Sequence, residues 1–381
     1  MIPRLAQAHL RQMLATYPAA ALLGPRQAGK TTLARAMGGL YFDLEDSQDR
    51  LRLDVQWAEI LARPSLVALD EAQVMPELFP RLRVAIDAER QRHGRFLLLG
   101  SIAPALMTSV AESLAGRLAL CELSPLLAAE LGWAKADALW HLGGFPDGGV
   151  LEPARFPLWQ QHYLDLMAQR DLPQWGLPAK PMVTQRLFRM LAAVHGQAWN
   201  ASLIGKGLGM SYHTVGSYLD FLAGAYLVRR LPPFAANLRK RLVKSPKVYW
   251  RDTGLLHALL GWQPDEDLLD RPWVGASWEG WVIEQILSCL QAAGASAQAS
   301  FLRTSDGQEI DLVLEYRGRL WAFEVKLTSI PEPRDLERLR KSARLIGADT
   351  CVLVSRTTTP IHGASEYSLD LAATLDLLLA A

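Results

Sequence analysis

The chain has 381 residues, of which 50% are hydrophobic, so it exceeds the usual size of a single domain and can bury more than one core. Its formal net charge of +1 excludes a polyanionic partner held by overall charge alone. Cys121, Cys289 and Cys351 form no CxxC pair, which argues against disulfides or a zinc site and is typical of a cytoplasmic protein. No apolar run reaches about 18 residues, and Pro3 and Arg4 interrupt the first residues, so neither a membrane span nor a signal peptide is predicted.

Short apolar runs alternate with helical stretches in the first part of the chain. Strands separated by helices predict an α/β domain with a parallel sheet covered on both faces. We assign this core to residues 1–150 and a helical lid to residues 151–180. The predicted strands are Ala19–Leu23, Leu66–Leu69, Phe96–Leu99 and Leu118–Leu123.

A phosphate-binding loop of the GxxxxGK[ST] pattern follows the first predicted strand and opens a helix. Backbone N–H groups of such a loop converge on phosphates, the lysine reaches the terminal phosphates, and the hydroxyl after it ligates Mg²⁺. The sequence therefore predicts that ATP and Mg²⁺ bind here, with Lys30 and Thr31 in these two roles. The residues of the loop are Gly24, Pro25, Arg26, Gln27, Ala28, Gly29, Lys30, Thr31 and Thr32.

Two acidic residues follow the second predicted strand, where a P-loop ATPase has its Walker B motif. We expect Asp70 to hold the Mg²⁺ shell and Glu71 to orient or deprotonate the attacking water. The alternative is a pair of solvated acidic side chains at a strand end. Ser101, after the third strand, can contact the γ-phosphate, although a hydroxyl after a glycine is also common in an ordinary turn.

Arg117 directly precedes the fourth predicted strand, where AAA-type ATPases present an arginine to the nucleotide of a neighbouring subunit. The prediction implies a homo-oligomer. The alternative is an arginine that caps the preceding helix. Arg170, followed by Asp171, is a weaker candidate for an arginine of the lid. The chain has no [NT]KxD motif for guanine, which favours adenine.

Residues 181–252 have the order of a winged helix: helix, helix, turn, helix, strand, strand. The predicted elements are helices at Arg186–Val194, Ala201–Gly205 and Tyr212–Ala225 and strands at Leu227–Leu231 and Lys247–Trp250.

Basic residues accumulate around the two predicted wing strands, and no acidic residue occurs between Phe221 and Arg251. A loop of this charge can follow a phosphate backbone, so we predict contact with DNA. The alternative is a solvated charged face of a module that contacts protein. The eight basic residues are Arg229, Arg230, Arg239, Lys240, Arg241, Lys244, Lys247 and Arg251.

Residues 253–381 carry the pattern of a restriction-endonuclease-like domain. Asp311 lies on the first strand of a predicted hairpin, and Glu324 and Lys326 share one face of the second. Two carboxylates that hold Mg²⁺ and a lysine that positions water form the D…ExK nuclease site. Glu279, at the start of an earlier helix, is the expected third metal ligand.

Nine runs of the sequence together resemble a broad family of bacterial and archaeal AAA-type ATP-binding proteins. The resemblance covers nearly the whole chain and implies an ATPase core followed by a C-terminal domain of unknown function, which here resembles PD-(D/E)xK nucleases. One departure is Leu99, where the family usually has Thr. The runs are GPRQAGKTT, LDEAQ, LLLGS, SLAGR, GGFP, RDL, LPPF, KSPKVYWRDTGLL and EIDLVLE.

Two functions of different classes follow from these patterns. The first is an ATP-driven enzyme that remodels or translocates DNA, which the C-terminal domain cuts or grips. The second is a nucleotide-switched regulatory or scaffold protein with an inert nuclease-like binding module. The complete set of Glu279, Asp311, Glu324 and Lys326 favours the first, because an inert module has no chemical need for it.

Overall fold

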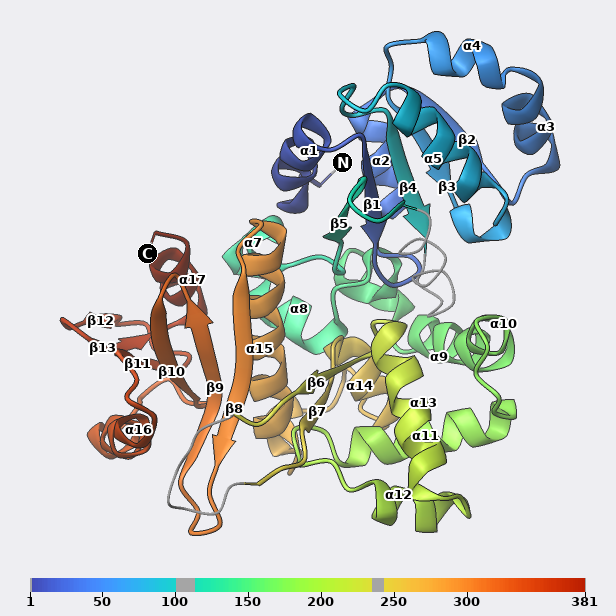
Figure 1. Ribbon diagram of the computed structural model, residues 1–381. Helices are drawn as coiled ribbons and strands as arrows, with labels where there is room; N and C mark the ends of the chain where they lie inside the picture. The colour runs from blue at the N-terminus through green and yellow to red at the C-terminus, as the bar shows by residue number, and fades with distance from the viewer. Residues whose placement is uncertain (1, 101–113, 235–242, 381) are drawn as a thin grey trace.

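The computed structural model describes residues 2–100, 114–234 and 243–380. Figure 1 shows a parallel sheet with its helices at the top, a group of helices at the lower right and a second sheet at the lower left. Within the described ranges, no helix is long and apolar enough to cross a membrane.

The first sheet has five parallel strands in the order β2-β3-β4-β1-β5. It confirms the predicted parallel sheet and adds β2, a short and only half-buried edge strand that has no long apolar run. Because all strands are parallel, their carboxyl ends lie along one edge of the sheet. The strands are β1 (Ala19–Leu23), β2 (Leu40–Asp43), β3 (Val67–Asp70), β4 (Phe96–Gly100) and β5 (Leu118–Glu122).

Helices cover both faces of this sheet because alternate residues of each strand point to opposite sides. Ala20 and Leu22 of β1 pack with α1 and α2, whereas Ala19, Ala21 and Leu23 pack on the side of α5. The strands are apolar on both faces for this reason. The helices of this region are α1 (Ala6–Thr16), α2 (Lys30–Met37), α3 (Ser47–Val55), α4 (Trp57–Ala62) and α5 (Leu78–Ala88).

The middle of the chain is helical and ends in a two-stranded antiparallel sheet. Helices α11, α12 and α13 precede strands β6 and β7, which is the order predicted for residues 181–252; their identity as a winged helix stays a prediction. The elements are α7 (Ala128–Leu131), α8 (Ala136–Leu142), α9 (Leu158–Leu166), α10 (Leu172–Gln174), α11 (Pro181–Ala193), α12 (Ala201–Leu208), α13 (Tyr212–Gly224), β6 (Val228–Leu231), β7 (Lys247–Trp250) and α14 (Thr253–Leu259).

The last region is a six-stranded mixed sheet in the order β12-β13-β11-β10-β9-β8. The predicted hairpin is present as β9 and β10, and α15 packs on one face of the sheet while α16 packs on the other. The elements are α15 (Val274–Ala292), β8 (Ala297–Arg303), β9 (Glu309–Tyr316), β10 (Arg319–Val325), α16 (Pro333–Ile346), β11 (Thr350–Val354), β12 (Ile361–His362), β13 (Glu366–Leu369) and α17 (Leu371–Ala380).

The two sheets and the helical region share packing and polar contacts. One hydrophobic core joins Trp140 of α8, Tyr249 of β7, Trp278 of α15 and Phe301 of β8. The segments that flank the β6–β7 connection also hydrogen-bond to the edge strand β8, where the amide of Phe234 donates to the carbonyl of Phe301 at 2.7 Å. The described residues on both sides of this connection, Phe234 and Val243, therefore lie against strand β8 of the C-terminal sheet.

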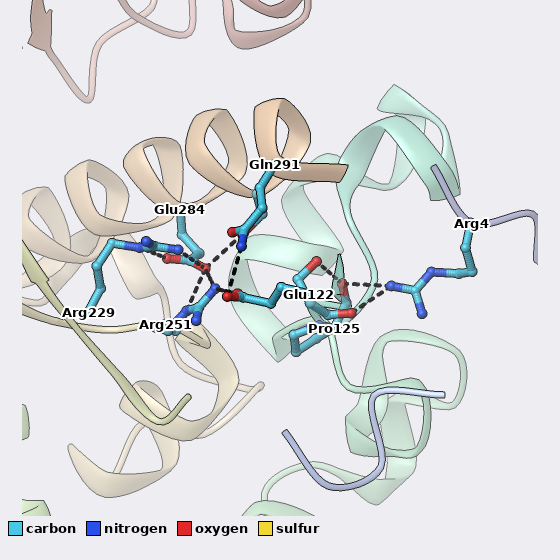
Figure 2. Close-up of polar contacts among 9 residues, drawn as sticks. Arg4, Glu122, Pro125, Arg229, Arg251, Glu284 and Gln291 are labelled. Atoms are coloured by element: carbon cyan, nitrogen blue, oxygen red, sulfur yellow. Dashed lines mark hydrogen bonds and ion pairs between the residues drawn. The ribbon is translucent and has the colours of Figure 1, made fainter. Parts of the chain in front are cut away.

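A buried charged network also fixes the ATPase sheet to the C-terminal region (Figure 2). Arg251, just after β7, contacts Glu122 of β5 at 2.5 Å and Glu284 of α15 at 2.7 Å. Arg229 of β6 contacts Glu284 at 2.6 Å, and Gln291 of α15 donates to Glu122 at 3.0 Å. The end of β7 thus connects the helical middle region to both the ATPase sheet and the C-terminal region.

Candidate functional site: a phosphate-binding cavity

The phosphate-binding loop connects the carboxyl end of β1 to the amino end of α2, as predicted. Gly24 lies so close to the next strand that a Cβ there would be 2.2 Å from the carbonyl oxygen of Leu123, and no side chain fits. Gly29 has a φ of 95°, a left-handed conformation that glycine adopts without strain. The two glycines of the motif are therefore required by the shape of the loop.

Lys30 is buried inside the loop. Its Nζ donates to the carbonyl oxygens of Gly24 at 3.0 Å and Pro25 at 2.8 Å. Burial lowers the pKa of Lys30 to about 8, although Glu71 and Asp70 oppose this shift. The ammonium group thus lies where the sequence predicted a contact with phosphates.

Asp70, at the end of β3, is hydrogen-bonded to the hydroxyl of Thr31. Its Oδ2 accepts from Thr31 at 2.6 Å and from the hydroxyl of Tyr41 at 2.7 Å. The structure therefore brings together the two predicted Mg²⁺ ligands. Tyr41, on β2, was missed by sequence reasoning because nothing local marks a tyrosine on an edge strand as a partner of Asp70.

Glu71 has a left-handed backbone, with φ of 49° and ψ of 46°. Such strain in a residue other than glycine is concentrated at functional sites. Burial raises the pKa of Glu71, and hydrogen bonding from Gln73 and the charge of Lys30 oppose the rise. Glu71 therefore has the raised basicity and the position expected of a group that accepts a proton from water.

These side chains line one cavity of about 370 Å³. A second cavity of about 370 Å³ is lined by Ile2, Pro3, Leu33 and Leu126, and it shares the lining residues Gly29, Thr32 and Pro146 with the first. The first is polar and the second mostly apolar. The lining residues of the polar cavity include Arg26, Lys30, Thr31, Asp70, Glu71, Arg170 and Asp171.

Arg4 joins the N-terminal segment to this site. Its guanidinium donates to the carbonyl oxygens of Ala28 at 2.8 Å and Ser124 at 2.6 Å, and its Nε lies 3.0 Å from Glu130. Figure 2 shows Arg4 beside Pro125, which follows β5, and Glu122 is the last residue of that strand. The phosphate-binding loop and the end of β5 are thus held by one side chain.

Arg117 lies at the opposite end of the sheet from the loop. Leu118 pairs with Ala19 at the amino end of β1, whereas the loop follows Leu23, so roughly 17 Å of strand separates them. Arg117 forms hydrogen bonds with Asp87 at 2.7 and 2.8 Å. It is too far from the phosphate-binding loop of its own chain to act there, so an action in a neighbouring subunit stays a prediction. Its hydrogen bond to the carbonyl oxygen of Ala115 at 3.0 Å agrees with the alternative of a cap on the preceding helix. Ser101 lies outside the described residues.

Two of the runs that carry the family resemblance pack against each other. The Asp252 carboxylate of the RDTGLL run accepts from the amide of Gly144 in the GGFP run at 2.6 Å and from that of Leu255 at 2.9 Å. A Cβ on Gly254 would lie 2.1 Å from the carbonyl oxygen of Leu142. These runs are therefore structural, since they fix helix α14 beneath the ATPase core.

The predicted nuclease-like residues come from α15, β9, β10 and the residue directly after β10, and the ammonium group of Lys247 lies among them. Asp311 accepts from the amide of Val325 at 2.9 Å, which places it beside Glu324 and Lys326, themselves paired at 2.5 Å. Lys247 Nζ lies 2.9 Å from Glu279 and 3.7 Å from Asp311.

The expected metal centre is not formed in this part of the molecule. Lys247 Nζ also lies 2.8 Å from Glu309 of β9. No group of three or more carboxylate, histidine or cysteine side chains among the described residues could hold a metal ion. The ammonium group neutralises Glu279 and Asp311, so Mg²⁺ at Glu279, Asp311 and Glu324 stays a prediction that requires Lys247 to move.

Half of the eight basic residues predicted to face DNA form ion pairs within the chain, and only the pair of Arg230 with Asp220 among these is exposed. Arg229 and Arg251 contact Glu284, Lys247 contacts Glu279, and Arg230 pairs with Asp220. Lys247 is buried and the side chain of Arg251 is only 9% exposed, so the expectation that these two residues face a phosphate backbone is wrong. Arg239, Lys240 and Arg241 lie outside the described residues.

The affinity for ADP should fall as the pH rises above about 8. Below this value Lys30 is protonated, and above it the nucleotide-free protein must take up a proton before Lys30 can pair with phosphates. By linkage, the dissociation constant should rise about tenfold per pH unit above 8. Calorimetry from about pH 7 to about pH 9.5 measures this, with proton uptake on binding as a second readout. A constant affinity over this range would show that Lys30 stays charged or lies away from the phosphates.

Comparison with known proteins agrees with the geometry of the loop. Residues 16–132 match the model of the AAA domain, and residues 134–266 and 274–370 match two domains of unknown function, DUF8612 and DUF4143. A Walker-type ATPase of Pyrococcus abyssi has a TM-score of 0.46 and 16% identity over 68% of this chain and 95% of that chain. Uncharacterised proteins of Mycobacterium tuberculosis and Mycobacterium bovis are each 41% identical over 331 residues, which is 86% of this chain and 74% of theirs. The chain therefore belongs to the family of these mycobacterial proteins, and it has an AAA-type P-loop ATPase core followed by two domains of unknown function.

Proposed function

We propose that this protein binds ATP with Mg²⁺ and hydrolyses it to ADP and phosphate. The observation that carries the proposal is the 2.6 Å contact between the Thr31 hydroxyl and the Asp70 carboxylate, in the cavity that also holds Lys30 and Glu71. Four groups from the start of α2 and the end of β3 thus converge on one place, which is the arrangement that phosphoryl transfer requires.

The residues at this place fit a magnesium ion. Hydroxyl and carboxylate oxygens are its preferred ligands, and Thr31 and Asp70 supply one of each. Bound there, Mg²⁺ would neutralise charge on the β- and γ-phosphate oxygens. Lys30 holds the terminal phosphates, and Glu71 accepts the proton of the attacking water as the bond between the β-phosphate oxygen and the γ-phosphorus breaks.

The apolar cavity next to the loop supports a nucleoside as the rest of the ligand. Its lining by Ile2, Pro3 and Leu33 suits a flat aromatic base, and it shares Gly29 and Thr32 with the polar cavity. Because the chain has no guanine-reading motif, the proposed base is adenine.

Glu71→Gln should lower the rate of ATP hydrolysis by about 100-fold or more, because water loses its proton acceptor. ATP binding should persist, since Lys30 and the loop are unchanged. Release of phosphate under saturating MgATP measures the rate, and binding of a fluorescent ATP analogue measures the affinity.

The matched control is Glu59→Gln, which removes the same charge from an exposed position of α4. It should hydrolyse ATP like the unaltered protein. Hydrolysis by Glu71→Gln at the unaltered rate would show that Glu71 is not the proton acceptor. Absence of hydrolysis in the unaltered protein with Mg²⁺ would reject the proposed function itself.

The finer functions predicted from sequence stay predictions. Remodelling or cleavage of DNA draws support from the D…ExK residues at one place on β9 and β10, and is weakened by the internal pairing of Arg229, Lys247 and Arg251. A nucleotide-switched scaffold agrees equally with a C-terminal domain whose acidic cluster is neutralised by Lys247. A homo-oligomer rests on Arg117 alone.

A further inference from the structure

Arg26, inside the phosphate-binding loop, has an incompletely paired side chain. Its Nε is buried and donates no hydrogen bond to any residue that the structure describes. The nearest carboxylates are Asp171, 3.4 Å from Nε, and Glu45, 4.0 Å from a terminal nitrogen. Because a buried donor without an acceptor is costly, Arg26 needs a further partner.

The location of Arg26 indicates what that partner is. The side chain lines the polar cavity together with Lys30 and Glu71. The charge of Arg26 contributes to the lowered pKa of Lys30 and opposes the raised pKa of Glu71, although burial is the main cause of both shifts. A guanidinium group that lines the same cavity as a phosphate-binding lysine and a proton acceptor is suited to bind a phosphate oxygen.

Asp171 contacts the guanidinium groups of both Arg26 and Arg170. It is buried at the end of the short helix η5 (Met167–Asp171), in the lid. One carboxylate oxygen accepts from Arg170 Nε at 2.9 Å, and the other faces Arg26. A single carboxylate thus holds an arginine of the loop and an arginine of the lid on the same cavity.

The contact between Arg26 and Asp171 is weaker than a structural ion pair of this protein. Arg251 and Arg229, which connect the domains, approach Glu284 at 2.7 and 2.6 Å. Arg26 stays 3.4 Å from Asp171 and lies above the ring of Trp175 at 5.9 Å. The guanidinium can therefore turn to a phosphate without losing a strong bond.

We propose that Arg26 binds the γ-phosphate of ATP in its own subunit and that Asp171 is its positioning residue. This inference rests on the proposed ATP hydrolysis. Charge spreads over the γ-phosphate oxygens in the transition state, so a donor at this position accelerates hydrolysis as well as binding ATP. ADP has no γ-phosphate, so its affinity does not depend on Arg26.

The test compares Arg26→Ala, Arg26→Lys and Asp171→Asn with the unaltered protein. Arg26→Ala should lower kcat about 100-fold and ATP affinity about tenfold, with the affinity for ADP unchanged. Arg26→Lys should recover part of kcat, because charge returns without the planar donor group. The matched control is Arg189→Ala, which replaces an exposed arginine of α11. It should leave kcat, the affinity for ATP and the affinity for ADP unchanged.

Asp171 is tested by non-additivity. Asp171→Asn should lower kcat, but Arg26→Ala with Asp171→Asn should be no slower than Arg26→Ala alone, since Asp171 acts through Arg26. Additive losses would assign Asp171 a separate structural role and overturn its positioning role.

The role of Arg26 and the proposed function can fail separately. A kcat for Arg26→Ala within about threefold of the unaltered value would overturn the role of Arg26 while hydrolysis stands. If the unaltered protein hydrolyses no ATP, the role of Arg26 can still be tested from binding alone, by comparing the affinities for ATP and ADP. Loss of the preference for ATP over ADP in Arg26→Ala supports the contact, and its retention overturns it.

Discussion

Replacing Arg251 by methionine should lower the free energy of unfolding by about 3–5 kcal/mol, because it leaves buried carboxylates without their cation. Arg251 contacts both Glu122 and Glu284, and its own side chain is 9% exposed (Figure 2). Arg229 is still present to pair with Glu284, but within this network Glu122 keeps only Gln291. Urea unfolding followed by circular dichroism measures the loss.

The matched control is Arg155→Met. Arg155 also contacts two carboxylates, Asp147 and Glu152, but all three side chains are largely exposed. Exposed ion pairs contribute about 0–1 kcal/mol, so this variant should unfold almost like the unaltered protein. Equal effects of the two substitutions would show that the network of Arg251 is effectively solvated.

The effect of Arg251→Met should shrink in acid. Burial alone would raise the pKa of Glu284, but Arg229 and Arg251 outweigh it and lower the pKa to about 2. A carboxylate whose pKa is lower in the folded state stabilises the fold above its unfolded value of 4.5, and that stabilisation is lost as the pH falls towards 2. The difference in free energy of unfolding between Arg251→Met and the unaltered protein should therefore become smaller as the pH falls from 4.5 towards 2.

The phosphate-binding site could be predicted from sequence because its parts are local. The loop from Gly24 to Thr32 carries its glycines, lysine and hydroxyl in one run, and Asp70 and Glu71 directly end an apolar strand. Parallel strands bring such strand ends to one edge, so the meeting of Thr31 with Asp70 followed from the predicted sheet. Tyr41 could not be predicted, because its contact depends on β2 lying next to β3.

The role of the basic residues could not be predicted because their partners lie far along the chain. Arg229 pairs with Glu284, 55 positions away, and Arg251 pairs with Glu122, 129 positions away. A run without acidic residues appears unneutralised when it is read alone. Burial of Arg251 and Lys247 against acidic residues of other elements is a property of the tertiary structure, and it changes their predicted function.

Lys247, like Arg251, is a cation that joins carboxylates of different elements. It extends from β7 to Glu279 of α15 and to Glu309 and Asp311 of β9. Burial alone would lower the pKa of Lys247, but the three carboxylates outweigh it and raise the pKa. The same lysine opposes the rise in the pKa of Asp311 that burial, Glu279 and Glu324 cause.

Lys247→Met should therefore be less stable by about 3–5 kcal/mol near pH 8, because three facing carboxylates lose their shared cation. Without Lys247, the pKa of Asp311 rises further, so the folded state binds more protons than the unfolded state, and the lost stability returns as the pH falls. Thermal unfolding from about pH 8 to about pH 5 measures this, with Lys206→Met, an exposed lysine of α12, as the control that should change little. A loss of stability that does not depend on pH would mean that only packing of the lysine stem was lost.

Millimolar Mn²⁺ should raise the midpoint temperature of unfolding of Lys247→Met and leave that of the unaltered protein unchanged, because only the variant exposes the carboxylates to a cation. Equal responses of the two proteins would contradict the metal site predicted at Glu279 and Asp311.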